Sequence, residues 1–264
     1  SPEAMASPEA APALASTPAD EATTQAAVAA ADNIAACAND PAALASLVTA
    51  NLVQTHPFGG FPTIAEAMAN GFFEGVPYAA GVKVGDVVTY EDGSIGAKVT
   101  YMQSQYQAVG ELWNLVDVDG TWKLNAVANA EPDIESADFT AVVGAKLGEN
   151  EDGTYYLTPS RESVTEASVL VLQGTNEGQE PHEMVMVQLP EGVDPMGLLD
   201  GSVSEDQVNF IGFVFMPHTG DIANMTLVNL PAGKYTLLCF IPGPDGAPHA
   251  AHGMISPFEV TAAE

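Results

Sequence analysis

Basic residues, cysteines and long apolar runs are all scarce in this chain. Its 264 residues include 6 lysines and arginines against 35 aspartates and glutamates, a formal net charge of −29. Nucleic-acid binding depends on clusters of lysine and arginine that neutralise phosphates, so this composition excludes nucleic acid as a partner. No apolar run approaches the ~18 residues of a membrane-spanning helix. We therefore expect neither nucleic-acid binding nor a transmembrane segment.

The acid surplus has a second consequence. A strongly acidic surface keeps a secreted or salt-adapted protein hydrated, and it attracts cationic partners. A cationic redox protein is thus the partner class that the charge favours, although acidity alone assigns no function.

The chain has 2 cysteines, Cys37 and Cys239. Cys37 lies in an alanine-rich stretch typical of a helix, where a free cysteine behaves as a small apolar side chain. A disulfide between the two cysteines is the alternative in an oxidising compartment. It would join the two halves of the chain and consume the best metal-ligand candidate.

Residues 1–21 are nearly all alanine, proline, serine, glutamate and threonine. Such a segment buries too little apolar surface to offset its ordering entropy, so we expect a disordered tether. No charged and apolar leader is present, which predicts an exported protein whose signal peptide has been removed. The expected location is periplasmic, extracellular or at the cell surface, with an N-terminal lipid anchor as a further expectation.

Residues 22–132 have a helical pattern followed by a strand pattern. Residues 25–38 are alanine-rich, a second helix begins at Pro41 after the cap Asp40, and a capping box at Thr63 begins a third. Strands are expected at 85–90, 96–103, 111–118 and 121–127, and Asp119 with Gly120 predicts a hairpin.

Trp113 and Trp122 stand on either side of this hairpin. Three helices followed by a sheet that closes on such a pair resemble the nuclear-transport-factor-2-like or SnoaL-like superfamily. The resemblance covers 22–132 and implies an α+β cone, with three helices on a curled antiparallel sheet around a pocket. That superfamily includes isomerases, dehydratases and plain dimerisation modules, so the fold does not assign a function.

Acid–base catalysis would need a carboxylate or histidine beside a group that stabilises an oxyanion. Residues of these types are present, but they show no recognisable spacing. We therefore expect no catalytic residue and a first domain that binds a small ligand or forms homo-oligomers, while an isomerase- or dehydratase-like enzyme stays open. The candidates by type are His56, Asp86, Glu111, Tyr78, Tyr101 and Tyr106.

Residues 133–264 concentrate metal-binding side chains. Cys239, His249, His252 and Met254 lie close together near the C-terminus. Thiolate, imidazole and thioether are the donors of electron-transfer copper sites, in which two histidines and a cysteine surround the metal and a methionine binds weakly. His182, which begins an apolar run, supplies the other imidazole.

The spacing of these residues adds a resemblance. An Asn-x-Gly-x-x-Pro-His element ending at His182, a Tyr-x-x-x-Cys element ending at Cys239 and a His-x4-Met element ending at Met254 resemble the cupredoxin family. The resemblance implies an all-β Greek-key sandwich over 133–264. It also implies a mononuclear, type 1-like copper site with His182, Cys239, His249 and Met254 as ligands.

Two features depart from that family. The loop 240–248 is longer than in plastocyanin, and Glu183 stands where blue-copper proteins usually have an asparagine that braces the site. His252 in place of His249 is an alternative ligand if the long loop folds back. A second alternative is a sandwich that has lost its metal and keeps these side chains as packing groups.

A sandwich requires about eight strands in the second half. The apolar and β-branched runs predict them at 139–143, 153–157, 167–172, 184–189, 208–215, 224–230, 233–240 and 257–261.

The sequence therefore predicts an exported protein that transfers single electrons through copper, with His249 as the exposed edge that electrons cross. The alternative is a metal-free cell-surface interaction or structural protein whose first domain dimerises or binds a small ligand.

Overall fold

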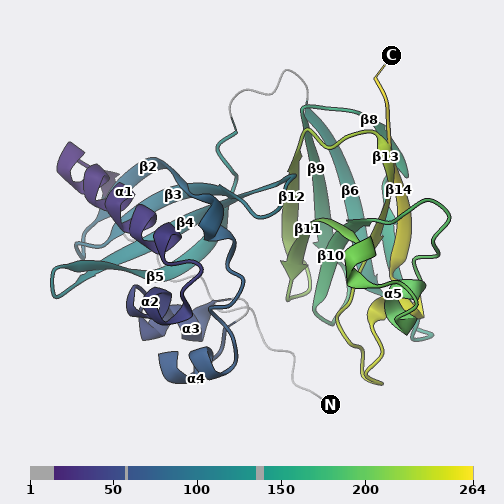
Figure 1. Cartoon of the computed structure of the whole chain (residues 1–264), viewed down its shortest axis with the longest axis horizontal. Helices are drawn as coiled ribbons and strands as arrows, with labels where there is room; N and C mark the ends of the chain where they lie inside the picture. The colour runs from purple at the N-terminus through teal and green to yellow at the C-terminus, as the bar shows by residue number, and fades with distance from the viewer. Residues whose placement is uncertain (1–14, 57–58, 135–139, 264) are drawn as a thin grey trace. The chain divides into compact units, whose positions relative to one another are not determined.

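The computed structural model describes residues 15–56, 59–134 and 140–263. The chain is mostly β-sheet, with few helices, and divides into two compact units (Figure 1). Unit 1 comprises Ser1–Met102 and Gly110–Asp133, and unit 2 comprises Gln103–Val109 and Ile134–Glu264. Within the described residues, no helix is both long and apolar enough to cross a membrane.

Each α-helix of unit 1 begins at a side-chain cap, and two of these caps, Asp40 and Thr63, are those that the sequence predicts. Asp20, Asp40, Thr49 and Thr63 each accept a hydrogen bond from a first-turn backbone N–H. The helices are α1 (Glu21–Ala36), α2 (Pro41–Ser46), α3 (Ala50–Thr55), α4 (Ile64–Ala69) and the 3₁₀ helix η1 (Pro77–Ala80).

The expected second helix is two helices, which corrects the prediction of three helices in this region. Between α2 and α3, Leu47 O accepts a hydrogen bond from Leu124 N at 2.9 Å, and Thr49 N donates to Leu124 O at 3.0 Å. Val48 thereby forms a parallel bridge with Leu124. A backbone that bonds to a strand cannot also continue the helical ladder, so the helix ends and Thr49 caps a new one.

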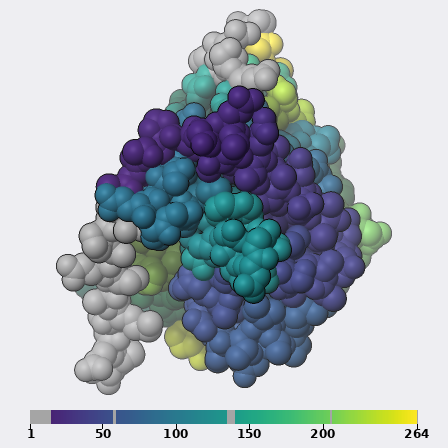
Figure 2. Space-filling model, turned by 90° about the vertical axis from the view of Figure 1, so that its left-hand side faces the viewer, coloured from purple at the N-terminus to yellow at the C-terminus, as the bar shows by residue number. Residues whose placement is uncertain are grey.

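The strands of unit 1 follow the order β1-β2-β3-β4 within a nine-stranded sheet, and β5 pairs with β4 off this path. Its strands are β1 (Ser16–Pro18), β2 (Lys83–Tyr90), β3 (Ile95–Met102), β4 (Gln107–Val118) and β5 (Thr121–Ala130), and the described pairings are antiparallel. Alternation buries Val99, Trp113 and Leu115. Ala27 and Ile34 are among the buried side chains of α1, which packs on β2 and β5. Figure 2 shows α1 to α4, purple to blue, around the teal β4–β5 hairpin.

The tether prediction is wrong for residues 16–18. Ser16, Thr17 and Pro18 pair with Tyr90, Thr89 and Val88. Proline is tolerated there because β1 is an edge strand. Residues 1–14 lie outside the described part of the chain.

Unit 2 is built from two sheets (Figure 1). The first is the β12-β9-β6-β7 part of the nine-stranded sheet and contains β6 (Thr140–Glu149), β7 (Tyr155–Pro159), β9 (Val169–Asn176) and β12 (Ile222–Val228). The second has the order β11-β10-β13-β14-β8 and contains β8 (Ser163–Thr165), β10 (His182–Gln188), β11 (Asn209–Met216), β13 (Gly233–Leu238) and β14 (Ile255–Thr261). The short elements α5 (Gly197–Asp200), η2 (Glu205–Gln207) and η3 (His249–His252) complete unit 2.

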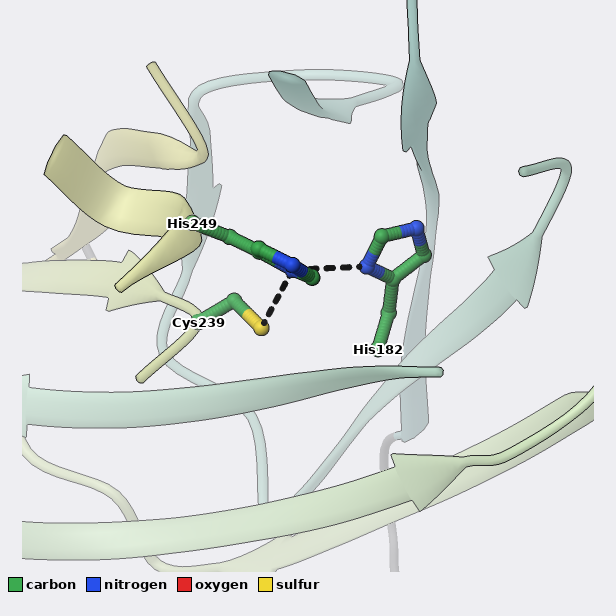
Figure 3. A group of neighbouring side chains, drawn as sticks. All are labelled: His182, Cys239 and His249. Atoms are coloured by element: carbon green, nitrogen blue, oxygen red, sulfur yellow. Dashed lines mark hydrogen bonds between the residues drawn. The ribbon is translucent and has the colours of Figure 1, made fainter. Parts of the chain in front are cut away.

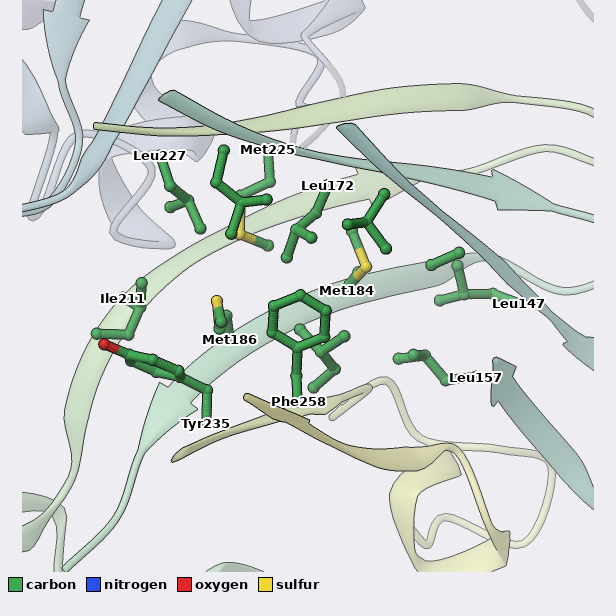
Figure 4. Packing of buried hydrophobic residues seen from close by; sticks show 14 of the residues in the cluster. Leu147, Leu157, Leu172, Met184, Met186, Ile211, Met225, Leu227, Tyr235 and Phe258 are labelled. Atoms are coloured by element: carbon green, nitrogen blue, oxygen red, sulfur yellow. The ribbon is translucent and has the colours of Figure 1, made fainter. Parts of the chain in front are cut away.

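The core of unit 2 lies between these sheets (Figure 4). Leu147 and Leu172 come from one sheet, and Met184 and Phe258 come from the other; all are almost fully buried. Burying such a side chain contributes about 1.5–3 kcal/mol. The metal-ligand candidates extend this core at one end.

Gln103–Val109 belongs to unit 2, although the sequence pattern predicts that it lies in the first domain. The side chain of Gln107 donates to Phe213 O at 2.7 Å and accepts from Phe213 N at 2.9 Å. Gln107 and Ala108 also pair with Leu227 and Thr226 of β12. These partners are far away in the sequence, so local patterning could not reveal that the segment belongs to unit 2.

Candidate metal centre

Three separate segments contribute the candidate ligands. His182 begins β10, Cys239 directly follows β13, and His249 begins η3. On β10, His182 shares the inward face with Met184 because side chains alternate along a strand. Cys239 is inward for the same reason, two residues after Leu237. All three candidate ligands are fully buried.

The three side chains point toward one another (Figure 3). His182 Nδ1 lies 3.2 Å from His249 Nδ1, and Cys239 Sγ lies 3.6 Å from His249 Nδ1. One potential ligand atom from each residue lies within 4.8 Å of the others. Two imidazoles and a thiol therefore face a common point inside the protein.

These separations match those around one metal ion. Zinc in tetrahedral sites lies about 2.0–2.1 Å from histidine nitrogen and about 2.3 Å from cysteine sulfur. Such bonds place two nitrogens roughly 3.3 Å apart, and a nitrogen and a sulfur roughly 3.6 Å apart. The observed 3.2 and 3.6 Å agree with both. The His-Cys-His donor set, soft sulfur with imidazole, is consistent with copper binding.

Burial controls the protonation of all three donors. It lowers the pKa of His182 and of His249, which keeps each imidazole neutral with a free lone pair. It raises the pKa of the Cys239 thiol to about 12, against the opposing effect of backbone N–H groups at Glu183 and Ile241. A cation at the site would supply the charge that lets this thiol release its proton.

Met254 lies beside these residues along the backbone. Its carbonyl oxygen accepts from Cys239 N at 3.2 Å, and its N–H donates to His249 O at 3.0 Å. The side chain is fully buried in the core of unit 2. These contacts place Met254 next to two candidate ligands, and its role as the weak fourth ligand stays a prediction.

Glu183 braces the site in place of the expected asparagine. Its N–H donates to Cys239 Sγ at 3.5 Å, and its carboxylate Oε1 accepts from Phe240 N at 2.9 Å. Both contacts fix the backbone on either side of the sulfur. A carboxylate at this position is therefore compatible with a formed site.

The Asn-x-Gly-x-x-Pro-His element is a tightly bonded loop. Asn176 donates from its side chain to Glu180 O at 2.8 Å and to Met216 O at 3.1 Å, and it accepts from Gly178 N at 2.8 Å. A buried amide that makes three such bonds fixes the entry to β10. These hydrogen bonds explain why an asparagine occupies position 176. They also orient the start of β10 so that His182 points inward.

The predicted role of His249 as an exposed edge is wrong, because its side chain is fully buried. Tyr155 stacks on its ring with centroids 4.1 Å apart and an interplanar angle of 17°. Its Nε2 lies 3.1 Å from Glu180 Oε2. The ring is covered by these two side chains instead of facing solvent.

The alternatives left open by the sequence involve His252 and Cys37. His252 has a partly exposed side chain, and its Nε2 lies 3.0 Å from Asp245 Oδ2. It is not part of the group that His249 joins. Cys37 and Cys239 are both free, so the disulfide is not formed.

Unit 1 contains a separate buried polar cluster. Glu111 accepts hydrogen bonds from Tyr78 OH at 3.3 Å, Tyr101 OH at 3.0 Å and Trp113 Nε1 at 2.7 Å. Burial raises the pKa of Glu111. Three acid–base candidates that have no recognisable sequence spacing thus lie together. The ring of Tyr78 also packs edge to face on those of Tyr101 and Trp113.

Of the other candidates by type, Tyr106 lies in unit 2, within Gln103–Val109. The structure does not place His56 or Asp86 among the hydrogen-bond partners of Glu111.

The chain matches no protein-family model and no curated protein. Among solved structures it is similar to reduced auracyanin from Roseiflexus castenholzii, at 22% identity over 49% of this chain and 100% of that one, with a TM-score of 0.32. Auracyanin A, a "blue" copper protein from Chloroflexus aurantiacus, is 15% identical over 47% and 100%, with a TM-score of 0.29. Rusticyanin from Thiobacillus ferrooxidans is 19% identical over 46% and 80%, with a TM-score of 0.32. The case for a metal site therefore rests on the donor residues of this chain.

Proposed function

We propose that this protein is an exported copper-binding protein that transfers single electrons through one copper ion. His182, Cys239 and His249 would hold the ion, with Met254 as a weak fourth ligand. Copper supplies the change between Cu(I) and Cu(II). The buried, hydrogen-bonded ligands would keep one arrangement in both oxidation states, so little reorganisation would accompany the transfer.

One observation carries this proposal. Three fully buried donors from three separate segments face a common point at metal-ligand separations. A chain with 5 histidines and 2 cysteines has few ways to assemble such a set by packing alone.

The test is to add Cu(II) to the full-length protein and to measure bound copper and the visible absorption spectrum. We expect one copper per chain and an intense thiolate-to-copper band. Cys239→Ser should abolish the band, whereas Cys37→Ser, the matched control at the other free cysteine, should leave it unchanged. No band and no stoichiometric copper in the wild type would overturn electron transfer and favour the metal-free interaction protein. Retention of zinc in preference to copper would also overturn electron transfer, because zinc has no redox chemistry.

Because His249 is covered, electrons need another route to the surface. Phe240 directly follows Cys239 and is 37% exposed, so it offers a short covalent path from the proposed thiolate to solvent. A cationic redox protein remains the proposed partner class, since the chain carries a net charge of −29.

For unit 1 we propose a non-catalytic pocket or association module of the nuclear-transport-factor-2-like type. The packing of α1 on β2 and β5 and of α3 on β5 supports this proposal. Sedimentation of the full chain over a range of concentrations tests association. A monomer at every concentration, together with turnover of a ketosteroid- or polyketide-type substrate, would favour an enzyme instead.

A further inference from the structure

Both candidate histidine ligands have a carboxylate at the nitrogen that faces away from the proposed metal. His182 Nε2 lies 3.1 Å from Glu149 Oε1, and His249 Nε2 lies 3.1 Å from Glu180 Oε2. The Nδ1 atoms of the same rings face each other at 3.2 Å. Each imidazole is therefore held between a carboxylate on one side and the metal position on the other.

The two contacts differ in their alignment. The ring of His249 faces Glu180 with hydrogen-bond geometry. Among the described buried side-chain nitrogens and oxygens, His182 Nε2 is the one that lacks an aligned partner, despite its short distance to Glu149. A small rotation of the His182 ring would align this contact, because the distance is already that of a hydrogen bond.

Each carboxylate is itself held in place. Glu149 accepts from Gln179 N at 2.8 Å and from Glu180 N at 2.9 Å. A Cβ at position 178 would clash with Glu149 Oε2, so Gly178 leaves the space that this carboxylate fills. Backbone N–H groups of the loop before β10 therefore hold Glu149 in place.

Tyr155 holds the second carboxylate and the second ring together. Its hydroxyl donates to Glu180 Oε2 at 3.1 Å, and its ring stacks on His249. The phenol thus fixes both members of the Glu180–His249 pair.

We propose that Glu149 and Glu180 are positioning residues that orient the two imidazoles and bias the bound copper toward Cu(II). A carboxylate that accepts the proton of a ligating imidazole fixes its tautomer, leaves Nδ1 free for the metal and raises its basicity. The carboxylate charge stabilises Cu(II) more than Cu(I), because the oxidised ion carries the larger charge. The inference rests on the proposed copper site. It identifies the two carboxylates as groups that set the reduction potential of that site.

The decisive variant is Glu180→Gln, which keeps the size of the side chain and removes its charge. Glu177→Gln is the matched control, since Glu177 lies in the same loop and contacts Lys146 Nζ at 2.6 Å instead of a candidate ligand. In the copper-loaded full-length protein we expect Glu180→Gln to lower Cu(II) affinity by about 10–100-fold, as for other outer-shell partners. Cu(I) affinity should change less.

Each tenfold change in the ratio of the two affinities corresponds to about 59 mV for one electron. A redox titration should therefore show a higher potential for Glu180→Gln and an unchanged potential for Glu177→Gln. Tyr155→Phe keeps the ring stack on His249 but removes the hydroxyl that donates to Glu180. The carboxylate then becomes a stronger acceptor for His249. The reduction potential of copper in Tyr155→Phe should therefore not rise.

Circular dichroism and melting of each variant establish that the fold is kept. Equal potentials in Glu180→Gln and Glu177→Gln, with copper bound in both, would overturn the inference and leave the proposed function standing. Absence of copper from the wild type would instead overturn the proposed function. If Glu180→Gln did not fold, Tyr155→Phe would decide, and a raised potential there would contradict the inference.

Discussion

Single residues decide which imidazole can bind the metal. His249 and His252 are close in sequence, yet one is fully buried and faces His182, whereas the other lies near the surface beside Asp245. Local spacing cannot distinguish them, because a short loop can present either ring to the site.

This difference predicts the outcome of two alanine substitutions. His249→Ala removes a candidate ligand and should lower copper affinity by more than the 10–100-fold typical of outer-shell partners. His252→Ala should change it by less than tenfold, since its contact is an exposed acid. Competition with a copper chelator measures both, and a larger loss in His252→Ala would reverse the assignment.

Glu111 is the residue of unit 1 with the clearest dependence on pH. Burial raises its pKa above the ordinary value of 4.5, so the folded protein holds this proton to a higher pH than the unfolded chain. The unfolding free energy then falls as pH rises from about 4.5 through the raised pKa. The loss is about 1.4 kcal/mol for each pH unit that separates the folded-state pKa from the unfolded-state pKa.

Glu111→Gln lacks this titration and isolates it from other groups. The stability of the wild type relative to the variant should therefore be highest near about pH 4 and decrease toward about pH 7. Urea unfolding followed by tryptophan fluorescence reports on unit 1 alone, because Trp113 and Trp122 are the 2 tryptophans of the chain. A difference that is constant with pH would contradict the raised pKa.

At the scale of elements, η3 and its ends position two of the candidate ligands. The helix ends at Gly253, whose φ of 109° lies in the left-handed region, and Met254 follows directly. A Cβ at Gly253 would lie 2.8 Å from Tyr155 O. Glycine is thus required here both by conformation and by the close approach of β7.

Gly253→Ala should destabilise unit 2 by more than the about 1–2 kcal/mol of left-handed strain. Gly246→Ala is its control, because Gly246, in the loop before η3, also has a left-handed φ of 83° but no atom within 4 Å of an added Cβ. We expect a larger fall in the melting temperature for Gly253→Ala and a weaker copper band. Equal melting temperatures would show that the contact with Tyr155 relaxes without cost.

At the scale of the whole molecule, the net charge of −29 opposes the compact state through repulsion between acids. Few lysines or arginines offset it, and the ion pairs that Lys83 and Lys146 form are exposed, a class that contributes little to stability. Stability should therefore depend on ionic strength.

Raising salt from about 0.01 M to about 1 M shortens the screening length from about 30 Å to about 3 Å. The melting temperature should rise over this range, equally in sodium chloride and potassium chloride. A flat or falling melting temperature would show that the acids are spaced too widely for their repulsion to matter, and a difference between the salts would indicate binding of a specific ion.

The amino-acid sequence alone determined the local features of this protein. The capping residues Asp40 and Thr63 begin helices as expected, and the predicted strands of the second half correspond to observed ones with shifted ends. These features depend on neighbours within a few residues, whose identity is directly visible in the chain. The donor types of the candidate metal site are visible for the same reason.

Only the tertiary structure decided what surrounds those donors. It placed the Nδ1 atoms of His182 and His249, 67 residues apart in sequence, within 3.2 Å, and it moved Gln103–Val109 into unit 2. It covered His249 with Tyr155 and Glu180 where an exposed edge was expected. Such contacts depend on how sheets and loops pack across long sequence separations, and no local pattern encodes which partners meet.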